Sequence, residues 1–414
     1  MNTFSYIFLI ALALHLAVHL WLDGRHLRHV RANRAAVPLA FAGEIPLSAH
    51  QKAADYTTAR LRFGFIETVA SAAVLLAWTL GGGFDALDRW LRGFGGSELS
   101  SGVAFIIGAF ILMAIIDLPA QIYRTFVIEQ RFGFNRTDAR TFVMDLVKAA
   151  ALMLVLGAPL AALVLWLMQH SGPWWWFYVW LTWTGFSLLM LWAFPVFIAP
   201  LFNKFEPLQD NDLVTRIGNL LARTGFKSNG VFVMDGSRRS AHGNAYFTGF
   251  GTNKRIVFFD TLLRELNGAE IEAVLAHELG HFKRRHVLKR IVVMALTSLI
   301  GLAVLGWLIK QPWFYSGLGM STPSVHAALV LFLTVAPIFT FLLQPMMSRW
   351  SRQHEFEADE YAVRQSDGQS LITALVKLYK ENANTLTPDP IYSAYHDSHP
   401  PAPIRVAHVQ ALMQ

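Results

Sequence analysis

The residues whose types and spacing are most able to do chemistry form one short run, His277-Glu278-Leu279-Gly280-His281. On an α-helix the two histidines leave the same face one turn apart, so both rings could bind one metal ion. Glu278 lies beside them, where its carboxylate could take a proton from a water molecule that zinc activates. This pattern predicts a zinc site that hydrolyses peptide bonds.

The residues before this run predict the helix that the site needs. Asn267 can cap that helix, and Glu270, three residues later, can complete a capping box. Ile271, Val274 and Leu275 then form an apolar face at helical spacing. We therefore expect the two histidines to lie on a rigid helix.

A catalytic zinc ion usually takes three protein ligands and leaves the fourth position to water. Glu355 could be the third ligand, because it lies in the charged segment 352–359, which follows the last apolar run and is expected to be helical. Asp359 is four residues further on, so one carboxylate could bind zinc while the other accepts an N–H from a ligand histidine. His354 and Glu357 are alternative ligands, and a solvated helix face would show the same charges.

Four blocks of the sequence resemble the CAAX prenyl protease 1 family, integral-membrane zinc metalloproteases whose known eukaryotic members process farnesylated proteins. The blocks are H-E-L-G-H, then E-F-x-A-D at 355–359, the stretch 236–247 with its continuation 253–263, and 395–401 followed by Arg405. The resemblance extends over most of the chain, including the apolar runs. It implies a membrane-spanning metallopeptidase with one Zn²⁺ per chain.

The resemblance also implies how the metal is held. It makes His277, His281 and Glu355 the zinc ligands and Asp359 the residue that orients a ligand. Glu278 becomes the general base that activates water and later hands its proton to the leaving amine. The partner is then a peptide or protein substrate, with a lipid attached if the family's pattern holds.

Further residues receive roles only through the resemblance. Asn244, Ala245 and Tyr246 resemble the edge strand on which such enzymes bind an extended substrate, with the Asn244 side chain near the scissile bond. His399 and Arg405 occupy the family's positions for residues that face the metal and stabilise the oxyanion. From the residues alone, His399 would be an ordinary loop histidine and Arg405 a surface or headgroup-binding arginine.

Composition independently predicts a polytopic membrane protein. Hydrophobic residues make up 54% of the chain and charged residues only 15%, against about 25% charged in soluble domains. Seven apolar runs are long enough to cross a bilayer. They lie near 4–22, 64–82, 102–120, 149–169, 175–200, 290–309 and 325–345.

The distribution of basic residues predicts the orientation, because cytoplasmic loops are rich in Lys and Arg. These residues number seven in 23–62 and five in 121–148, against two in 83–101, none in 170–174 and one in 310–324. The N-terminus should then lie outside and the catalytic segments in the cytoplasm, in what we expect to be a bacterial inner membrane. This bias and contact with lipid headgroups account for the net charge of +7, so no nucleic-acid partner is predicted.

The expected fold is mostly α, with seven transmembrane helices and a small α+β zinc-peptidase unit split between two segments. We divide the chain into 1–202, with helices one to five, 203–289, the catalytic segment, 290–345, with helices six and seven, and 346–414, with the third ligand. Within the soluble parts we expect helices at 210–224 and 369–382, strands at 230–234, 244–250 and 255–260, and a Pro-rich stretch at 388–403 that carries His399. The absence of cysteine excludes a Cys nucleophile.

Two other functions remain compatible with these patterns. One is a quality-control protease that cuts misfolded membrane proteins without requiring a prenyl group. The other is a non-enzymatic transporter or scaffold with a structural zinc ion. Three protein ligands and the presence of Glu278 argue against the structural site, because a structural zinc usually takes four protein ligands.

Overall fold

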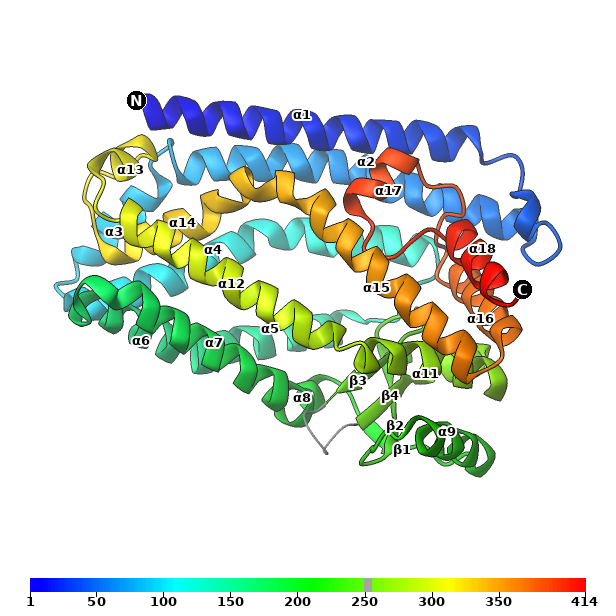
Figure 1. Ribbon diagram of the computed structural model, residues 1–414. Coiled ribbons are helices and arrows are strands. Elements are labelled where there is room, and N and C mark those ends of the chain that lie inside the picture. The colour runs from blue at the N-terminus through cyan, green and yellow to red at the C-terminus, as the bar shows by residue number, and fades with distance from the viewer. Residues whose placement is uncertain (249–254) are drawn as a thin grey trace.

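The computed structural model describes residues 1–248 and 255–414, and the predicted, mostly α membrane fold is confirmed (Figure 1). The helices of the first half are α1 (Thr3–Ala32), α2 (Leu47–Trp78), α3 (Gly83–Arg92), α4 (Glu98–Tyr123), α5 (Ala139–Leu152), α6 (Ala158–His170), α7 (Trp175–Ala193) and α8 (Ala199–Phe202). The π-helical segments Arg124–Glu129, Met153–Gly157 and Phe194–Ile198 continue α4, α5 and α7.

The second half carries the strands and the remaining helices. The strands are β1 (Phe205–Pro207), β2 (Val231–Met234), β3 (Ala245–Thr248) and β4 (Arg255–Phe259). The helices are α9 (Asn211–Thr224), α10 (Asp260–Glu265), α11 (Gly268–Lys283), α12 (His286–Leu308), α13 (Pro312–Gly317), α14 (Val325–Thr340), α15 (Gln344–Gln365), α16 (Gly368–Glu381), α17 (Pro390–His396) and α18 (Ala402–Leu412).

Among the described residues, seven helical segments are long and apolar enough to cross a membrane, as predicted. They are 3–32, 47–78, 98–129, 139–170, 172–202, 286–308 and 325–365. The two chain ends lie at opposite ends of the bundle, with the strands, α11 and α16 at the end that holds the C-terminus (Figure 1).

The predicted loop 23–62 is wrong as a loop, because most of it is helical. α1 continues to Ala32 and α2 begins at Leu47, so only a short connection separates them. At about 1.5 Å per residue, the 30 residues of α1 span about 45 Å, well beyond a hydrocarbon core of about 30 Å. Hydropathy detects only the lipid-facing part of such a helix, and the polar remainder extends the bundle outside the membrane.

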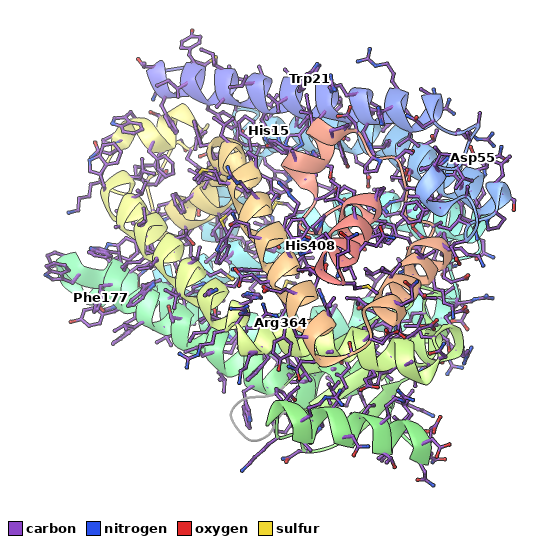
Figure 2. The ribbon with its side chains drawn as sticks, turned by 45° about the vertical axis from the view of Figure 1, so that its right-hand side comes forward. His15, Trp21, Asp55, Phe177, Arg364 and His408 are labelled. Atoms are coloured by element: carbon purple, nitrogen blue, oxygen red, sulfur yellow. The ribbon has the colours of Figure 1, made fainter. Side chains whose placement is uncertain are left out.

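Apolar side chains cover the outside of the bundle as well as its core. Trp21 on α1 and Phe177 on α7 lie at the margin of the molecule, with 52% and 37% of their surface exposed (Figure 2). Inside, Phe8, Phe105 and Leu331 belong to one buried cluster that joins α1, α4 and α14. An apolar exterior of this kind is stable only against lipid, so the chain is an integral multi-pass membrane protein.

The four strands form one sheet in the order β1-β2-β4-β3. β2 and β4 are parallel, whereas β3 runs antiparallel to β4 with Ala245 opposite Phe258. Phe258 and Ile256 are buried beneath α9 and α11 in a second core that also includes Leu275. The predicted strand 244–250 is confirmed as far as Thr248, and residues 249–254 lie outside the described part of the chain.

The two catalytic segments are joined where α11 packs along α15. Gly280 permits the contact, because a Cβ there would stand 2.9 Å from Cα of Ala358. The segment after the last apolar run is helical, as predicted, and it is the continuation of the seventh span through a short 3-10 turn at Phe341–Leu343. The seventh spanning segment therefore carries Glu355 directly to α11, the helix with the two predicted histidine ligands.

Candidate metal centre

The local sequence of α11 fixes where its histidines point. The predicted capping box is present: the Asn267 side chain accepts from the N–H of Glu270, and the Glu270 carboxylate accepts from the N–H of Asn267 at 2.8 Å. His277 is 7% exposed and His281 lies one turn further along the same face. The Nε2 atoms of the two rings are 3.1 Å apart.

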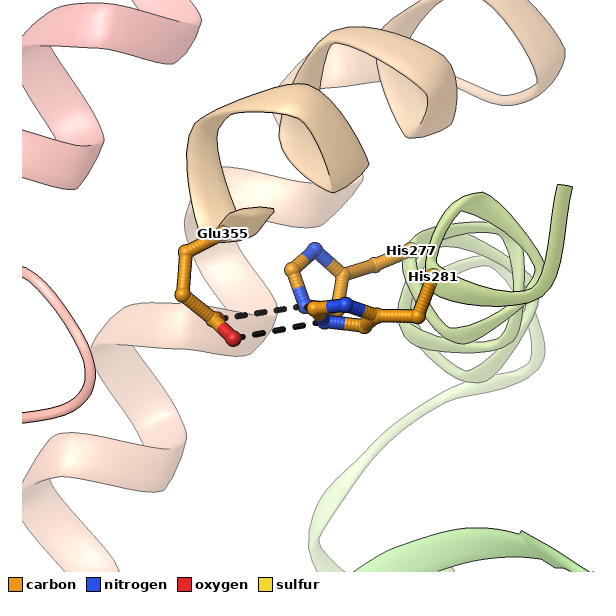
Figure 3. A group of neighbouring side chains, drawn as sticks. All are labelled: His277, His281 and Glu355. Atoms are coloured by element: carbon orange, nitrogen blue, oxygen red, sulfur yellow. Dashed lines mark hydrogen bonds and ion pairs between the residues drawn. The ribbon is translucent and has the colours of Figure 1, made fainter. Parts of the chain in front are cut away.

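Glu355 approaches these two nitrogens from α15 (Figure 3). Its Oε2 lies 3.4 Å from Nε2 of His277, and its Oε1 lies 3.3 Å from Nε2 of His281. Across the described residues, His277, His281 and Glu355 are the group of His, Cys, Asp or Glu side chains whose donor atoms converge closely enough for a metal, all within 4.8 Å. The structure thus brings together the three residues predicted as ligands.

The arrangement fits a tetrahedral metal ion. Ligands at about 2.0–2.1 Å from zinc stand about 3.3 Å from one another, which agrees with the observed spacings of 3.1–3.4 Å. The Glu355 side chain is buried and directs its two oxygens at the Nε2 atoms of the two histidines, as expected of a carboxylate that would share one ion with them. Two imidazoles and one carboxylate are also the donor set of many catalytic zinc sites.

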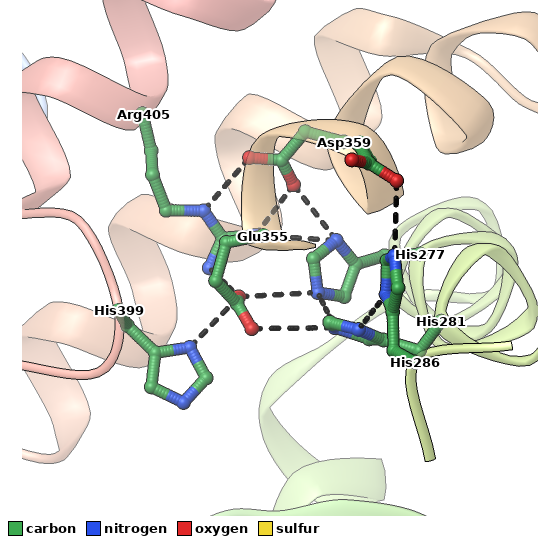
Figure 4. A network of polar contacts seen from close by, with 8 residues as sticks. His277, His281, His286, Glu355, Asp359, His399 and Arg405 are labelled. Carbon is green, nitrogen blue, oxygen red and sulfur yellow. Dashed lines mark hydrogen bonds and ion pairs between the residues drawn. The ribbon is translucent and has the colours of Figure 1, made fainter. Parts of the chain in front are cut away.

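Asp359 and Arg405 contact the His277 ring at Nδ1, on the side away from the metal position (Figure 4). Oδ1 of Asp359 lies 2.8 Å from Nδ1 of His277, so the ring presents Nε2 to the metal position. Arg405 donates to the same carboxylate from Nε at 2.9 Å and from Nη2 at 2.5 Å. Arg405 is only 7% exposed, and these contacts make it a positioning residue; its predicted direct role at the oxyanion stays a prediction.

His281 has a longer support, which the sequence analysis missed. Its Nδ1 lies 2.9 Å from Nδ1 of His286, and Nε2 of His286 lies 3.1 Å from Oε2 of Glu357. Arg285, with φ of 57°, adopts the left-handed conformation that turns the chain from α11 into α12 and presents His286. The available signal was the recurrence of His five residues after His281.

The two alternative ligands are therefore placed elsewhere. Glu357 contacts His286 and, at 4.0 Å, the ammonium group of Lys289. The ring of His354 stacks on His286 with 3.9 Å between centroids and an interplanar angle of 11°. Both residues contact His286, which in turn supports His281. Neither belongs to the group of side chains that converges on the metal position.

Comparison with known proteins decides the family. Residues 26–204 match the family model described as CAAX prenyl protease N-terminal, five membrane helices, and residues 207–413 match peptidase family M48. A CAAX prenyl protease 1 homolog of Arabidopsis thaliana is 39% identical over 74% of this chain and 72% of its own. The chain belongs to the CAAX prenyl protease 1 family.

Other members of the CAAX prenyl protease 1 family match over nearly the whole length. The Caenorhabditis elegans homolog is 34% identical over 98% of each chain. The crystal structure of S. mikatae Ste24p superposes with a TM-score of 0.92 at 29% identity and covers 99% of both chains. The protein is accordingly a membrane metalloendopeptidase of peptidase family M48, which acts on peptide or protein substrates.

In this CAAX prenyl protease 1 family member, two polar candidates remain beside the metal group. Glu278, next to His277 in the chain, is half-buried and makes no hydrogen bond or ion pair with the residues that the structure describes. His399 approaches Glu355, with Nδ1 2.7 Å from Oε2 of Glu355 and 62% of its side chain exposed (Figure 4). Both side chains therefore remain accessible to a substrate at the metal.

The predicted substrate strand forms an edge of the sheet. β3 pairs with β4 on one side and, in the four-stranded order, has no strand of the described chain on its other side. The backbone carbonyl of Asn244 accepts from Phe259, whereas its exposed side chain accepts from the N–H of Ala245 at 2.8 Å. Tyr246 is half-buried over Met234. The roles of these three residues toward substrate stay predictions.

Charges in the site favour a cation. Burial alone would lower the pKa of the His277 ring, and so would Arg405, but hydrogen bonds to Asp359 and Glu355 raise it to about 9.

Burial raises the pKa of Tyr379 to about 12, so its hydroxyl remains protonated and donates to the carbonyl of Pro400 at 3.2 Å. Tyr379, another residue that sequence reasoning missed, thus holds the turn that carries His399.

Proposed function

We propose that this metalloendopeptidase is zinc-dependent, with one Zn²⁺ per chain, and cleaves a peptide bond near the C-terminus of prenylated CAAX-type substrates. The observation that carries the proposal is the convergence of His277, His281 and Glu355 at the junction of α11 and α15. The relatives that cover most of the chain are named CAAX prenyl protease 1, which supports the substrate class.

Zinc, when held by these three residues, would polarise the scissile carbonyl and lower the pKa of water. Glu278 takes the proton of the attacking water and delivers it to the leaving amine. Its carboxylate is suited to this task, because no described residue holds it in a competing ion pair. His399, on the open side of Glu355, donates to the oxygen on which negative charge develops.

β3 would bind the substrate as an added strand. The unpaired edge offers backbone N–H and C=O groups to an extended peptide, so binding depends little on its side chains. Ala245 would pair with it through its backbone and Tyr246 would contact it through its side chain, because the bond from the N–H of Phe259 to the carbonyl of Asn244 places the backbone groups of Tyr246 against β4. Asn244 turns its amide toward the bond to be cut. Such pairing suits an enzyme that recognises one end of many different proteins.

We further propose that the catalytic end faces the cytoplasm, because the loops on that side carry the excess of Lys and Arg. A prenylated substrate would then be anchored in the same leaflet, and anionic headgroups would contact the basic loops. The bacterial inner membrane stays a prediction from the sequence.

The test compares zinc content and peptide cleavage in detergent for the wild type, His277→Ala and Glu355→Ala. We expect about one zinc per chain in the wild type, and loss of both zinc and cleavage in the two variants. His170→Ala is the matched control, since His170 lies on α6 away from the site and should keep both properties.

The substrate is tested with a farnesylated CAAX-type peptide and its unmodified counterpart. Faster cleavage of the farnesylated peptide supports the proposed specificity. Equal rates would remove the prenyl requirement and favour a quality-control protease. Cleavage that persists in the zinc-free variants would contradict the metal assignment itself.

A further inference from the structure

A cavity of about 720 Å³ adjoins the metal group. His399 and Pro401 line it on the side of the metal, and its other walls come from α1, α2, the segment after α4 and the ends of α16 and α17. His399 also contacts Glu355, so this one side chain lies between the cavity and the metal group. Its volume lies within the range of pockets that enclose small ligands.

Arg60 is a basic residue that lines this cavity. It lies on the polar part of α2 that precedes the apolar run 64–82, and its exposed side chain faces the cavity. Arg124, which also lines the cavity, forms an ion pair with Glu67. Arg60 has no ion pair with any carboxylate in residues 1–248 and 255–414.

The surroundings hold the Arg60 guanidinium in place. Its Cζ lies 5.4 Å from the centroid of the Tyr56 ring, within the range of a cation–π contact. The Tyr56 hydroxyl in turn donates to Glu129 at 2.6 Å, which fixes the ring. The guanidinium therefore lies beside the Tyr56 ring and close enough to Glu129 to interact with its charge, and its planar group carries more N–H donors than the Tyr56 hydroxyl can engage.

Three carboxyl groups line the cavity, and two of them could oppose an anion, since Glu67 is paired with Arg124. Burial raises the pKa of Asp397, which favours its neutral form. Asp23 of α1 lines the same cavity and forms no ion pair with Arg60 within the described residues. The competing explanation for Arg60 is structural: a water molecule would link its guanidinium to Asp23. The variants described below distinguish this pairing from the binding of an anion.

Resting on the proposed function, we propose that Arg60 binds the C-terminal carboxylate of the substrate. In a CAAX-type substrate three residues follow the prenylated cysteine, and an extended segment of that length spans about 10 Å. Its carboxylate therefore lies away from the metal, inside the adjoining cavity. A guanidinium recognises a carboxylate through two parallel hydrogen bonds, so this contact would restrict the enzyme to free chain ends.

The test uses one farnesylated peptide with either a free C-terminal carboxylate or a C-terminal carboxamide. For the wild type we expect kcat/KM to be about tenfold or more higher for the acid, as loss of a charged hydrogen bond implies. Arg60→Gln should lower kcat/KM for the acid peptide to the value of the amide peptide, and it should leave kcat/KM for the amide peptide unchanged. Arg62→Gln, two residues further along α2 and outside the cavity lining, should keep the wild-type preference.

Two further variants keep the test decisive. Asp23→Asn should retain the preference for the acid, whereas the structural pairing predicts equal harm to both peptides from Asp23→Asn and Arg60→Gln. If Arg60→Gln is too unstable to cleave either peptide, Arg60→Lys must still prefer the acid. Equal cleavage of acid and amide by the wild type overturns the inference alone, and failure of the wild type to cleave the acid overturns the proposed function with it.

Discussion

The Glu278 carboxylate stands beside the ligand histidines and is engaged by no described partner. We expect Glu278→Gln to lower kcat by about 10²–10⁴-fold, because a general base contributes on that scale. Zinc content should stay at the wild-type level, since Glu278 is not a ligand. Cleavage and elemental analysis of one purified sample check both; a variant that keeps wild-type activity would refute the mechanism.

His286 supports His281 through a single ring-to-ring contact. We expect His286→Ala to weaken zinc binding by about 10–100-fold, the usual effect of removing the partner of a metal-bound histidine. Glu357→Gln should weaken binding less, since it leaves the ring in place. Competition against a chelator of known affinity measures the effect, with His170→Ala as the control. Unchanged zinc affinity in His286→Ala would mean that the contact between His286 and His281 has no role in metal binding.

At the scale of single residues, the sequence could predict the residues of the motif but not the side chains that hold them in place. His277 and His281 are four residues apart on one helix, so local geometry is sufficient. His286, the first residue of α12, meets Glu357 of α15 across 71 residues of sequence, and no local pattern encodes that contact. Arg405 likewise acquires its partner Asp359 only in the folded protein.

The packing of α11 on α15 depends on Gly280. A Cβ at this position would stand 2.9 Å from Cα and 3.0 Å from the carbonyl oxygen of Ala358, so Gly280→Ala must push the two helices apart. We expect a loss of about 1–3 kcal/mol of stability, as for other overpacked contacts, together with weaker zinc binding. Thermal unfolding with and without a chelator measures both effects.

Gly218→Ala is the matched control for this prediction. Gly218 lies on the exposed side of α9 with nothing near its missing Cβ, so the substitution should raise stability by up to about 1 kcal/mol through helix propensity. If both variants behaved alike, the close approach of α11 and α15 would not be what assembles the site.

Elements were predicted well where their signal is local. The cap at Asn267 and the apolar periodicity predicted α11 with its observed start. The helix expected at 210–224 is α9, which begins at Asn211 after the cap Asp210; from the sequence alone, Asn211 is an equally good cap. The ends of the spanning helices were not predictable, because hydropathy falls at the headgroups while helical hydrogen bonding continues. This is why the charged ends of α1 and α2 were taken for a loop.

At the scale of the whole molecule, the seven candidate spans of the described residues are an odd number, which would place the termini on opposite sides of the membrane. The absence of cysteine allows this to be tested with single substitutions. We expect Lys310→Cys, in the exposed turn after α12, to react with an impermeant maleimide in intact cells, and Gln414→Cys to react only after permeabilisation. The reverse pattern would invert the proposed orientation.

The predicted metal ligands lie in the sequence before and after two membrane spans. The order of membrane insertion therefore determines when the three residues can come together. His277 and His281 leave the ribosome before α12 and α14, and Glu355 leaves only after both. A nascent chain therefore cannot assemble the three-ligand site until its last two helices are inserted and turned back on the first catalytic segment. We expect a chain stalled during insertion to lack the complete group of three residues and therefore to be unable to cut the proteins around it.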